Sequence, residues 1–485
     1  MGLAVYSTLT RNKEPFEPLK AGSVGIYTCG PTVYMESHLG HAVGPVIFDT
    51  IKRYLVHKGY KVTWVVNITD VDDKIIKRAA ELGISTEKLA RDVEADYVAN
   101  IRKLRVDSID FMPRATEHIP EIVEMVSTLI SKGFAYATDG DVYYDISKKK
   151  DYGKLSNRNT EELLEGARLD VDERKRHAGD FALWKSAKPG EPSWPSPWGA
   201  GRPGWHIECS VMSMKYLGET FDIHGGGVDL IFPHHENEIA QSEAATGKPF
   251  ARIWMHNGLT QIGAEKMSKS LGNIVKLSDL LSRHPPELVR FFLLSTHYRR
   301  PLVYSEERIE EVRRGWEGFY RLFERIERVT ARSVFATEKK AERFETALDA
   351  AAAKAAGEFT GAMDDDFNTA RAIAVLFEFS AAVNRFIDES KVESPGASAA
   401  DKTTLIEAGR ALRGLGMILG LFEEPIALSG QVEGLEPRLV ELIIELRNRA
   451  RQLKNFELAD YARKSLADIG VLLEDRPEGT TWRKK

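Results

Sequence analysis

The sequence predicts an α/β protein built on a parallel sheet, and its N-terminal part carries the observations that indicate this. Residues 24–28 form a short apolar run that is typical of a strand. Apolar side chains then recur at helical spacing from Val43 to Leu55, and Gly59 is placed to end that helix. Residues 62–68 form a continuous β-rich run, as expected of a buried parallel strand. These segments together predict a strand–helix–strand unit.

Changes of composition along the chain predict five parts. Strand signals return after a stretch that is rich in Trp, Pro and Gly, so an insertion is expected to split the sheet domain. Helical periodicity dominates the region that follows. The predicted parts are the first half of the sheet domain (1–115), the insertion (116–200), the second half of the sheet domain (201–305), a helical bundle (306–425) and a small C-terminal domain (426–485).

Composition narrows the class of protein. The chain has 485 residues, is 43% hydrophobic and has a formal net charge of −5. No apolar run approaches the roughly 18 residues that span a bilayer, and the N-terminus has no secretory signal, so a cytoplasmic protein without a membrane partner is expected. The net charge neither suggests nor excludes binding to nucleic acid. Two cysteines cannot staple a chain of this length, although one disulfide between them remains the alternative to two free thiols.

A histidine motif follows the first predicted strand. His38-Leu39-Gly40-His41 lies in the loop that enters the next helix, and ligands of open α/β sheets bind at that edge. Two imidazoles near a helix N-terminus can donate to phosphate oxygens, and the helix dipole favours negative charge there. Gly40 leaves room for adenine or ribose against the backbone. The tetrapeptide alone is more often simply two surface histidines on a loop.

A second polar motif, Lys266-Met267-Ser268-Lys269-Ser270, lies between Gly263 and Gly272. A flexible loop with two ammonium groups can close on a triphosphate and offset the charge that develops during phosphoryl or nucleotidyl transfer. The alternative is a solvated polar loop. The histidine motif and this lysine motif, in this order, resemble the two signatures of class I aminoacyl-tRNA synthetases.

The two cysteines lie inside dense polar motifs. Cys29 precedes the histidine motif, and Cys209 precedes His234 and Glu238. A helix would place His234 and Glu238 on one face because they are four residues apart, whereas His235 is expected to point elsewhere. Zinc takes tetrahedral sulfur, nitrogen and oxygen ligands. The two cysteines with His234 and Glu238 are therefore a candidate zinc set, although a lone His-x3-Glu is usually an ordinary helix pair.

Further motifs resemble the cysteinyl-tRNA synthetase family over essentially the whole chain. They lie at residues 29–34, 67–74, 204–210, 224–230, 363–370 and 479–482. The resemblance implies a Rossmann-type parallel-sheet catalytic domain with an insertion, followed by a helical bundle and a small C-terminal anticodon-binding domain. It also implies ligation of L-cysteine to tRNA(Cys) with ATP, through a cysteinyl-adenylate, by a monomer.

The resemblance assigns roles to residues of this sequence. Catalytic roles fall on His38, His41, Lys266 and Lys269. ATP binding falls on His38, Gly40, His41, Gly226, Asp229 and Lys269, with Mg²⁺ bound together with ATP. Substrate binding falls on Gly30, Thr69, Trp205 and His224. One zinc ion is implied on Cys29, Cys209, His234 and Glu238.

Zinc suits an enzyme that must distinguish cysteine from serine. The two amino acids differ by one atom, and a pocket that relies on apolar shape separates such near-isosteres by only about 10- to 200-fold. Zinc prefers soft thiolate ligands and deprotonates a coordinated thiol, whereas a hydroxyl gains far less. The metal is therefore expected to select cysteine over serine through the substrate thiol, so that no editing domain is needed to remove serine. Since four protein ligands resemble a closed structural site, Glu238 is the ligand expected to loosen.

The C-terminal helices are expected to contact tRNA. Basic side chains that could meet phosphates are Arg447, Arg449, Arg451, Lys454, Arg463 and Lys464. Trp482 is expected to stack on, or pack beside, an unpaired anticodon base. The alternative for the charges is a solvated helix face.

Two rival functions remain. The ligase that joins cysteine to an amino-sugar alcohol in mycothiol synthesis shares the zinc set and both signatures, but it lacks the long C-terminal tail that this chain has through Trp482. A non-catalytic zinc-containing RNA-binding protein derived from a synthetase would be expected to lose the signature histidines or lysines, and all of them are present.

Overall fold

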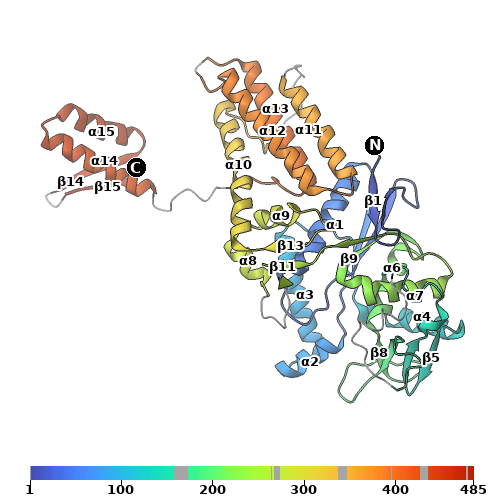
Figure 1. Cartoon of the computed structure of the whole chain (residues 1–485). Helices are drawn as coiled ribbons and strands as arrows, with labels where there is room; N and C mark the ends of the chain where they lie inside the picture. The colour runs from blue at the N-terminus through green and yellow to red at the C-terminus, as the bar shows by residue number, and fades with distance from the viewer. Residues whose placement is uncertain are drawn as a thin grey trace. The chain divides into compact units, whose positions relative to one another are not determined.

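The computed structural model divides into two compact units, Met1–Glu424 and Pro425–Lys485, which are described separately (Figure 1). The residues that it describes are 2–157, 173–263, 265–266, 274–336, 347–394, 396–426, 435–476 and 479–484.

A parallel sheet of four strands stands at the centre of the first unit, in the order β10-β9-β3-β4. Its strands are β3 (Ser23–Thr28), β4 (Lys61–Val66), β9 (Phe221–Gly227) and β10 (Ala251–Asn257). The predicted α/β class is confirmed, and both N-terminal strands lie where their apolar runs predict them. Since all four strands run in the same direction, their carboxyl ends meet at one edge.

Helix α1 (Leu39–His57) connects β3 to β4 and covers one face of the sheet. Phe48 of this helix packs so tightly on β9 that any side chain at Gly225 would overlap its ring. The helix starts before the position that the apolar spacing predicts, because Leu39 already has helical backbone and His38 is the N-cap residue. The histidine motif is thus the first turn of α1 rather than a loop before it.

Helices α6 (Trp205–Leu217) and α7 (Glu236–Thr246) cover the opposite face. Cys209 of α6 and Ile239 of α7 share an apolar core with Trp254 and other inward-facing residues of the sheet. Consecutive strand residues point to opposite faces. His224 therefore points toward α6 and α7, while its neighbour Gly225 faces α1.

The insertion folds as an antiparallel sheet in the order β5-β6-β7-β8. Its elements are η1 (Ala115–His118), α4 (Ile119–Ser131), β5 (Ala135–Thr138), β6 (Asp141–Tyr144), η2 (Ile146–Lys148), β7 (Phe181–Ser186) and β8 (Gly201–Pro203). Ile122 and Leu129 of α4 share a buried core with Ile207 of α6 and Ala240 of α7. The insertion therefore supports the outer side of these two helices.

Smaller elements complete the periphery of the sheet. They are β1 (Ala4–Ser7) paired with β2 (Asn12–Pro15), the helices α2 (Asp73–Leu82), α3 (Thr86–Lys103), α8 (Leu277–Arg283) and α9 (Pro286–Leu294), and the sheet β12 (Glu265–Lys266), β11 (Thr260–Ile262) and β13 (Leu302–Tyr304).

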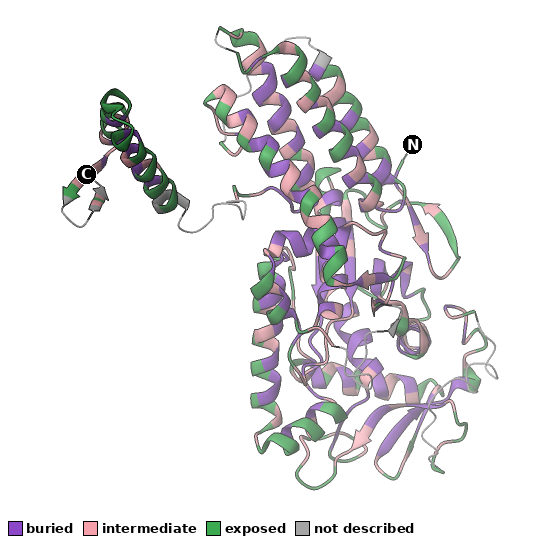
Figure 2. Cartoon of the chain, turned by 60° about the vertical axis from the view of Figure 1, so that its left-hand side comes forward, coloured by how far each residue is buried: buried purple, intermediate pink, exposed green. Residues whose placement is uncertain are grey.

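The end of the first unit is helical, as the sequence predicts. Its helices are α10 (Glu306–Thr330), α11 (Ala347–Asp364), α12 (Thr369–Ser390) and α13 (Ala399–Ile418). Figure 2 shows buried residues along the sides on which these helices face each other. Helix α13 starts at Ala399, where the Ser398 hydroxyl caps it by accepting a hydrogen bond from Asp401 N at 3.0 Å.

The second unit contains α14 (Leu435–Gln452), α15 (Phe456–Asp468) and the antiparallel pair β14 (Val471–Arg476) and β15 (Gly479–Lys484). Its small core contains Ile444 and Leu466, and Trp482 packs against it. Leu439, Leu442 and Leu446 of α14 remain 48%, 50% and 55% exposed. Among the described helices of either unit, none is long and apolar enough to cross a membrane.

A buried arginine joins the sheet domain to the end of the helical region. Arg290 of α9 and Asp49 of α1 are both fully buried and lie 2.6 Å apart. The guanidinium also donates to the carbonyl oxygens of Leu104 and Leu419, at 2.8 and 2.7 Å. Any side chain at Gly420 would press on the same guanidinium. One arginine thus connects α1, the turn after α3, and the chain just before the second unit.

Replacing this arginine should destabilise the first unit. Arg290→Ala removes the fully buried arginine partner of Asp49, which then keeps Arg53, at 2.8 Å, as its ion-pair partner, and it also removes the donor to the carbonyl oxygens of Leu104 and Leu419. We expect a loss of about 3 kcal/mol in the free energy of unfolding. The matched control is Arg78→Ala, which removes an exposed arginine that pairs with Glu81 across one helical turn and should cost at most about 0.5 kcal/mol. Urea unfolding monitored by circular dichroism measures both. Equal losses for the two variants would contradict this role of Arg290.

Candidate active site and metal centre

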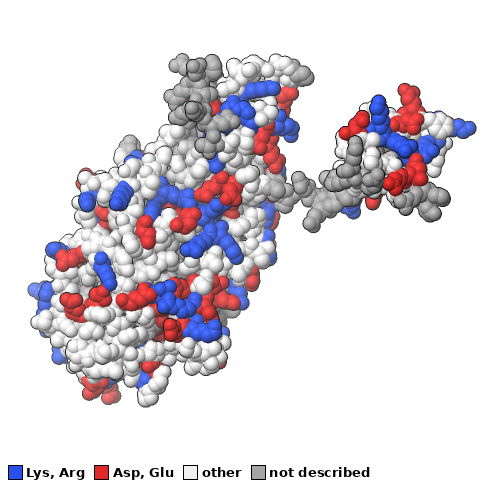
Figure 3. All heavy atoms as spheres, turned by 180° about the vertical axis from the view of Figure 1, so that it is seen from behind, with Lys and Arg blue, Asp and Glu red and all other residues white. Residues whose placement is uncertain are grey.

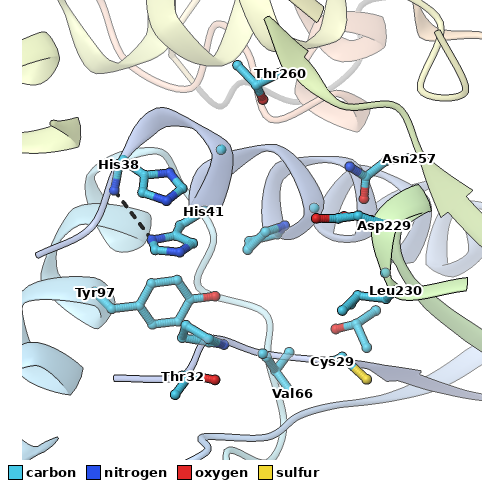
Figure 4. A pocket seen from close by; sticks show the side chains of 18 of the residues that line it. Cys29, Thr32, His38, His41, Val66, Tyr97, Asp229, Leu230, Asn257 and Thr260 are labelled. Carbon is cyan, nitrogen blue, oxygen red and sulfur yellow. Dashed lines mark hydrogen bonds between the residues drawn. The ribbon is translucent and has the colours of Figure 1, made fainter. Parts of the chain in front are cut away.

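A cavity of about 430 Å³ opens at the carboxyl edge of the parallel sheet (Figure 4). It is lined by residues at or just beyond the ends of all four strands, including Thr28, Val66, Gly227 and Asn257. Eight of the residues predicted from the sequence line it, namely Cys29, Gly30, His38, Gly40, His41, Trp205, Gly226 and Asp229. Thr69 and His224 are not among its lining residues.

His38 and His41 stand together at the start of α1. Their rings stack with centroids 3.6 Å apart and planes at 20°. The backbone N–H of His38 donates to Nδ1 of His41 at 3.4 Å (Figure 4). Because the N-terminus of a helix carries partial positive charge, the two imidazoles and the helix end favour an anion in this part of the cavity.

The histidine motif is hydrogen-bonded to the chain that follows the lysine motif. Leu39 N donates to Val275 O at 3.0 Å, and Leu277 N donates to Ser37 O at 2.9 Å. This backbone pairing holds residue 275 next to the first turn of α1. The backbone of Lys266 ends strand β12, whereas its side chain and the whole of Lys269 lie outside the described residues.

Four potential metal ligands converge beside the cavity. Cys29, Cys209, His234 and Glu238 each offer a ligand atom, and these atoms all lie within 4.8 Å of one another. Cys29 Sγ is 3.8 Å from Cys209 Sγ and 3.4 Å from Glu238 Oε1. His234 Nε2 is 3.0 Å from the same Glu238 oxygen. Both cysteines are free, so the disulfide alternative is wrong.

The fold explains why residues so far apart in sequence meet here. Cys29 follows the end of β3, and Cys209 belongs to α6 on the face opposite α1. His234 lies in the short π-helical turn Ile231–His235 that leads into α7, where Glu238 follows one turn later. The edge of the sheet, α6, and α7 with the turn before it therefore contribute the four side chains.

A cation fits the charges of this cluster. Burial alone would lower the pKa of His234, but the charges of Glu238 and Cys209 raise it to about 10. Burial alone would raise the pKa of Glu238, but His224 and His234 lower it to about 2. The buried Nε2 of His234 lies 3.0 Å from Glu238 Oε1, but among the described residues no contact of this nitrogen has hydrogen-bond geometry. A metal cation at the centre of the cluster could bind this nitrogen together with the acidic ligands.

Outer hydrogen bonds hold these ligands in place. His206 Nδ1 lies 2.8 Å from His234 Nδ1, and His224 Nε2 lies 2.8 Å from Glu238 Oε2. Burial is the main cause, and the charge of the nearby His234 the second, that keeps the pKa of His206 well below its usual range. The His206 ring therefore stays neutral and can accept a hydrogen bond. Such outer partners orient metal ligands and fix their tautomers. His224 is thus directed at Glu238.

The expectation that His235 points away from the cluster is wrong. Its Nε2 lies 3.3 Å from Cys29 Sγ, and its ring is fully buried. Its Nδ1 lies 2.8 Å from Nε2 of His256, and Nδ1 of His256 lies 2.8 Å from the Thr8 hydroxyl. The spacing is compatible with this contact, because His235 precedes Glu238 by three residues and side chains three or four apart share one face of a helix; its Nε2 lies 3.9 Å from Glu238 Oε1.

Gly30 is required by a close approach of two strand ends. Its N–H donates to Asn67 Oδ1 at 2.9 Å, and any side chain on Gly30 would overlap the carbonyl oxygen of Asn67. The Asn67 amide in turn donates to the Thr69 hydroxyl at 3.2 Å. Thr69 therefore supports the wall that carries Gly30 and Cys29.

Trp205 joins the cavity to the metal cluster. Its ring stacks on that of His234, with centroids 4.1 Å apart and planes at 25°. Lys74 Nζ lies 5.8 Å from the Trp205 ring and 5.6 Å from the Tyr34 ring. Lys74, Tyr34, Tyr97 and Asn257 line the cavity but were missed as site residues. For Lys74 a signal was present, since it ends the motif at residues 67–74.

Models of known families match both parts of the first unit. Residues 15–314 match the family described as "tRNA synthetases class I (C) catalytic domain", and residues 358–423 match the "DALR domain". The fold and the cavity are thus those of a class I aminoacyl-tRNA synthetase.

Curated relatives narrow the class. This chain is 49% identical to the cysteine–tRNA ligase of Geobacter sulfurreducens, with 100% of both chains covered. It is also 49% identical to that of Thermococcus onnurineus, covering 100% of this chain and 99% of the relative, and 50% identical to that of Symbiobacterium thermophilum, with both chains fully covered. The chain therefore belongs to the cysteine–tRNA ligase family.

Solved structures agree with the fold. Methionyl-tRNA synthetase of Mycobacterium tuberculosis in complex with methionyl-adenylate superposes with a TM-score of 0.63 at 18% identity, covering 83% of this chain and 91% of that one. A putative arginyl-tRNA synthetase of Campylobacter jejuni gives a TM-score of 0.58 at 14% identity, covering 84% of this chain and 94% of that one.

Proposed function

We propose that this enzyme ligates L-cysteine to tRNA(Cys) in two steps through a cysteinyl-adenylate, with zinc recognising the substrate thiol. The observation that carries the proposal is that one cavity is lined both by the histidine pair of α1 and by Cys29 of the metal cluster. A triphosphate held at one end and a thiol held at the other would place the amino-acid carboxylate between them.

Adenylate formation needs position and charge rather than an enzymic base. The cysteine carboxylate is already ionised at neutral pH and attacks the α-phosphate of ATP, which releases pyrophosphate. His38 and His41 would donate to the phosphates from the start of α1, and Lys266 and Lys269 from the lysine motif. The terminal adenosine of tRNA then attacks the adenylate, through its 2′-hydroxyl by resemblance to class I enzymes.

Glycines and an acidic residue suit a nucleoside in the same cavity. Gly40 and Gly226 leave backbone exposed where adenine or ribose can lie, and Asp229 offers a carboxylate to the ribose hydroxyls. Trp205 walls the end of the cavity nearest to His234. Gly30 and Thr69 would shape the pocket for cysteine, with His224 acting through Glu238.

Zinc suits the residues of the cluster, which combine two thiols, an imidazole and a carboxylate. Cys29, Cys209, His234 and Glu238 would hold it, and it would supply a preference for thiolate over hydroxyl. Mg²⁺ bound with ATP, a monomeric state, a cytoplasmic location and the five-part domain division also belong to this proposal. Their support is the family resemblance.

Exchange of pyrophosphate into ATP tests the first step. We expect cysteine to support exchange and serine to support it no better than no amino acid, because serine offers zinc no soft ligand. Charging of tRNA with cysteine by the same preparation tests the second step. Exchange that is equally fast with serine would contradict thiol recognition by zinc. Exchange without charging of tRNA would favour the ligase of mycothiol synthesis.

The lysine motif should act on the phosphates alone. Lys269→Ala is expected to slow exchange by about 10²–10³-fold, which is typical of removing one group that stabilises developing charge. Zinc content and cysteine binding should stay as in the unchanged enzyme. Lys248→Ala is the control, because this exposed lysine pairs with Glu219 on the surface. Normal exchange by the Lys269 variant would remove this residue from the mechanism.

The second unit offers part of the predicted tRNA-binding surface. Arg449 and Arg451 of α14 are exposed, but Arg447 is only 3% exposed and donates to Asp475 at 2.7 and 2.8 Å. Arg447 therefore holds β14 to α14 and is withdrawn from the proposed phosphate contacts. Figure 3 shows Lys and Arg interspersed with Asp and Glu on the face that it presents, so phosphate binding depends on local groups of arginines rather than on net charge.

Removing the second unit separates the two steps. A chain ended at Glu424, the boundary of the first compact unit, should retain cysteine-dependent exchange. Its KM for tRNA should rise by about 10-fold or more, because phosphate contacts supply much of the affinity for nucleic acid. Steady-state charging kinetics measure this. An unchanged KM for tRNA would refute the assignment of the second unit.

A further inference from the structure

A second set of four potential ligands overlaps the first. Cys29, His224, His235 and Glu238 also place their ligand atoms within 4.8 Å of one another. His224, His235 and Glu238 are fully buried. The set shares Cys29 and Glu238 with the predicted zinc ligands but replaces a thiol and an imidazole by two imidazoles.

The carboxylate of Glu238 contacts the imidazoles of both sets. Oε1 lies 3.0 Å from His234 Nε2 and 3.9 Å from His235 Nε2, and Oε2 lies 2.8 Å from His224 Nε2. Cys29 Sγ likewise lies between the sets, 3.8 Å from Cys209 Sγ and 3.3 Å from His235 Nε2. An ion could therefore move from one set to the other without leaving either shared ligand.

His235 is prepared as a ligand in the same way as its neighbour His234. Each has a second imidazole 2.8 Å from its Nδ1, namely His256 for His235 and His206 for His234. A hydrogen bond from Nδ1 leaves the Nε2 lone pair free for a metal. The ring also depends on Gly226, where a Cβ would come within 2.8 Å of His235 Cε1. The close packing against β9 thus fixes Nε2 toward Cys29.

We propose that His224 and His235, with Cys29 and Glu238, form an alternative site for a divalent transition-metal ion, exclusive of the predicted zinc site. With one thiolate and two imidazoles instead of two thiolates and one imidazole, it should suit ions that favour nitrogen, such as Co²⁺, Ni²⁺ and Cu²⁺. The cluster then holds one ion in either of two positions. Which position is occupied depends on whether the Cys209 thiol is available as a ligand and on whether the ion prefers sulfur or nitrogen.

Cobalt spectroscopy of a conservative variant tests this without any activity measurement. Cys209→Ser in the full chain disables only the first set. We expect it to bind one Co²⁺, with about half the thiolate charge-transfer intensity of the unchanged protein, since one sulfur remains. X-ray absorption should then count one sulfur and two imidazoles. One sulfur with one imidazole would mean that Co²⁺ stays on the remnant of the first set, and would overturn the proposal.

Double variants provide a second measurement. Cys209→Ser with His234→Gln removes both ligands that are particular to the first set, and His224→Gln with His235→Gln removes those of the second. We expect the first double variant to bind Co²⁺ about 10- to 100-fold more tightly than the variant with all four changes, a loss of the size typical of removing groups around a metal. Equal affinities would refute the alternative site, as would two Co²⁺ ions per unchanged chain.

A third comparison separates the site from general effects of substitution. His118 is a buried histidine whose Nδ1 lies 2.8 Å from Arg114 O, outside both ligand sets. Adding His118→Gln to Cys209→Ser should leave the Co²⁺ affinity and the imidazole count of Cys209→Ser unchanged. Circular dichroism of each metal-free variant confirms that it is folded. A loss of Co²⁺ binding in this control would show that packing, rather than ligation, explains the effects.

Discussion

The buried carboxylate of Glu238 is the group on which the rest of the site depends. Its Oε1 lies 3.0 Å from His234 Nε2 and 3.4 Å from Cys29 Sγ, and its Oε2 lies 2.8 Å from His224 Nε2. A lone carboxylate buried this deeply would be very unfavourable unless it were paired. The surrounding histidines keep the pKa of Glu238 low, and the packing of α6 and α7 on the sheet brings them within reach. The fold and the chemistry of the cluster therefore support each other.

The same sheet edge serves two different chemistries. At the start of α1, a helix end and two stacked imidazoles favour phosphate. On the opposite face, thiols and imidazoles favour a soft cation. Cys29 and His38 both follow strand β3, so they line one cavity although they belong to different sites. The distance between the metal ligand Cys29 and the phosphate-binding His38 is thus determined by the few residues that connect β3 to α1.

Local patterns in the sequence were enough to predict the core of this arrangement. The apolar runs at residues 24–28 and 62–68 located β3 and β4, and the polar motifs located Cys29, His38 and His41. What could not be predicted depends on contacts between distant segments. Arg447 looks like a surface charge until β14 places Asp475 beside it. The contact of His235 with Cys29 depends on the close packing of its ring against Gly226 of β9, which is distant in the sequence from Cys29.

The metal centre depends on the insertion for its support. Glu236, at the start of α7, accepts hydrogen bonds from the backbone of Gly153 and Ser156 in the insertion, both at 2.9 Å. The insertion also completes the core behind α6 and α7. Grafting the four ligands onto a related sheet would therefore fail without this added module. The insertion and the four ligands thus form one structural block, and a sheet domain without the insertion would be expected to hold the ligands less firmly.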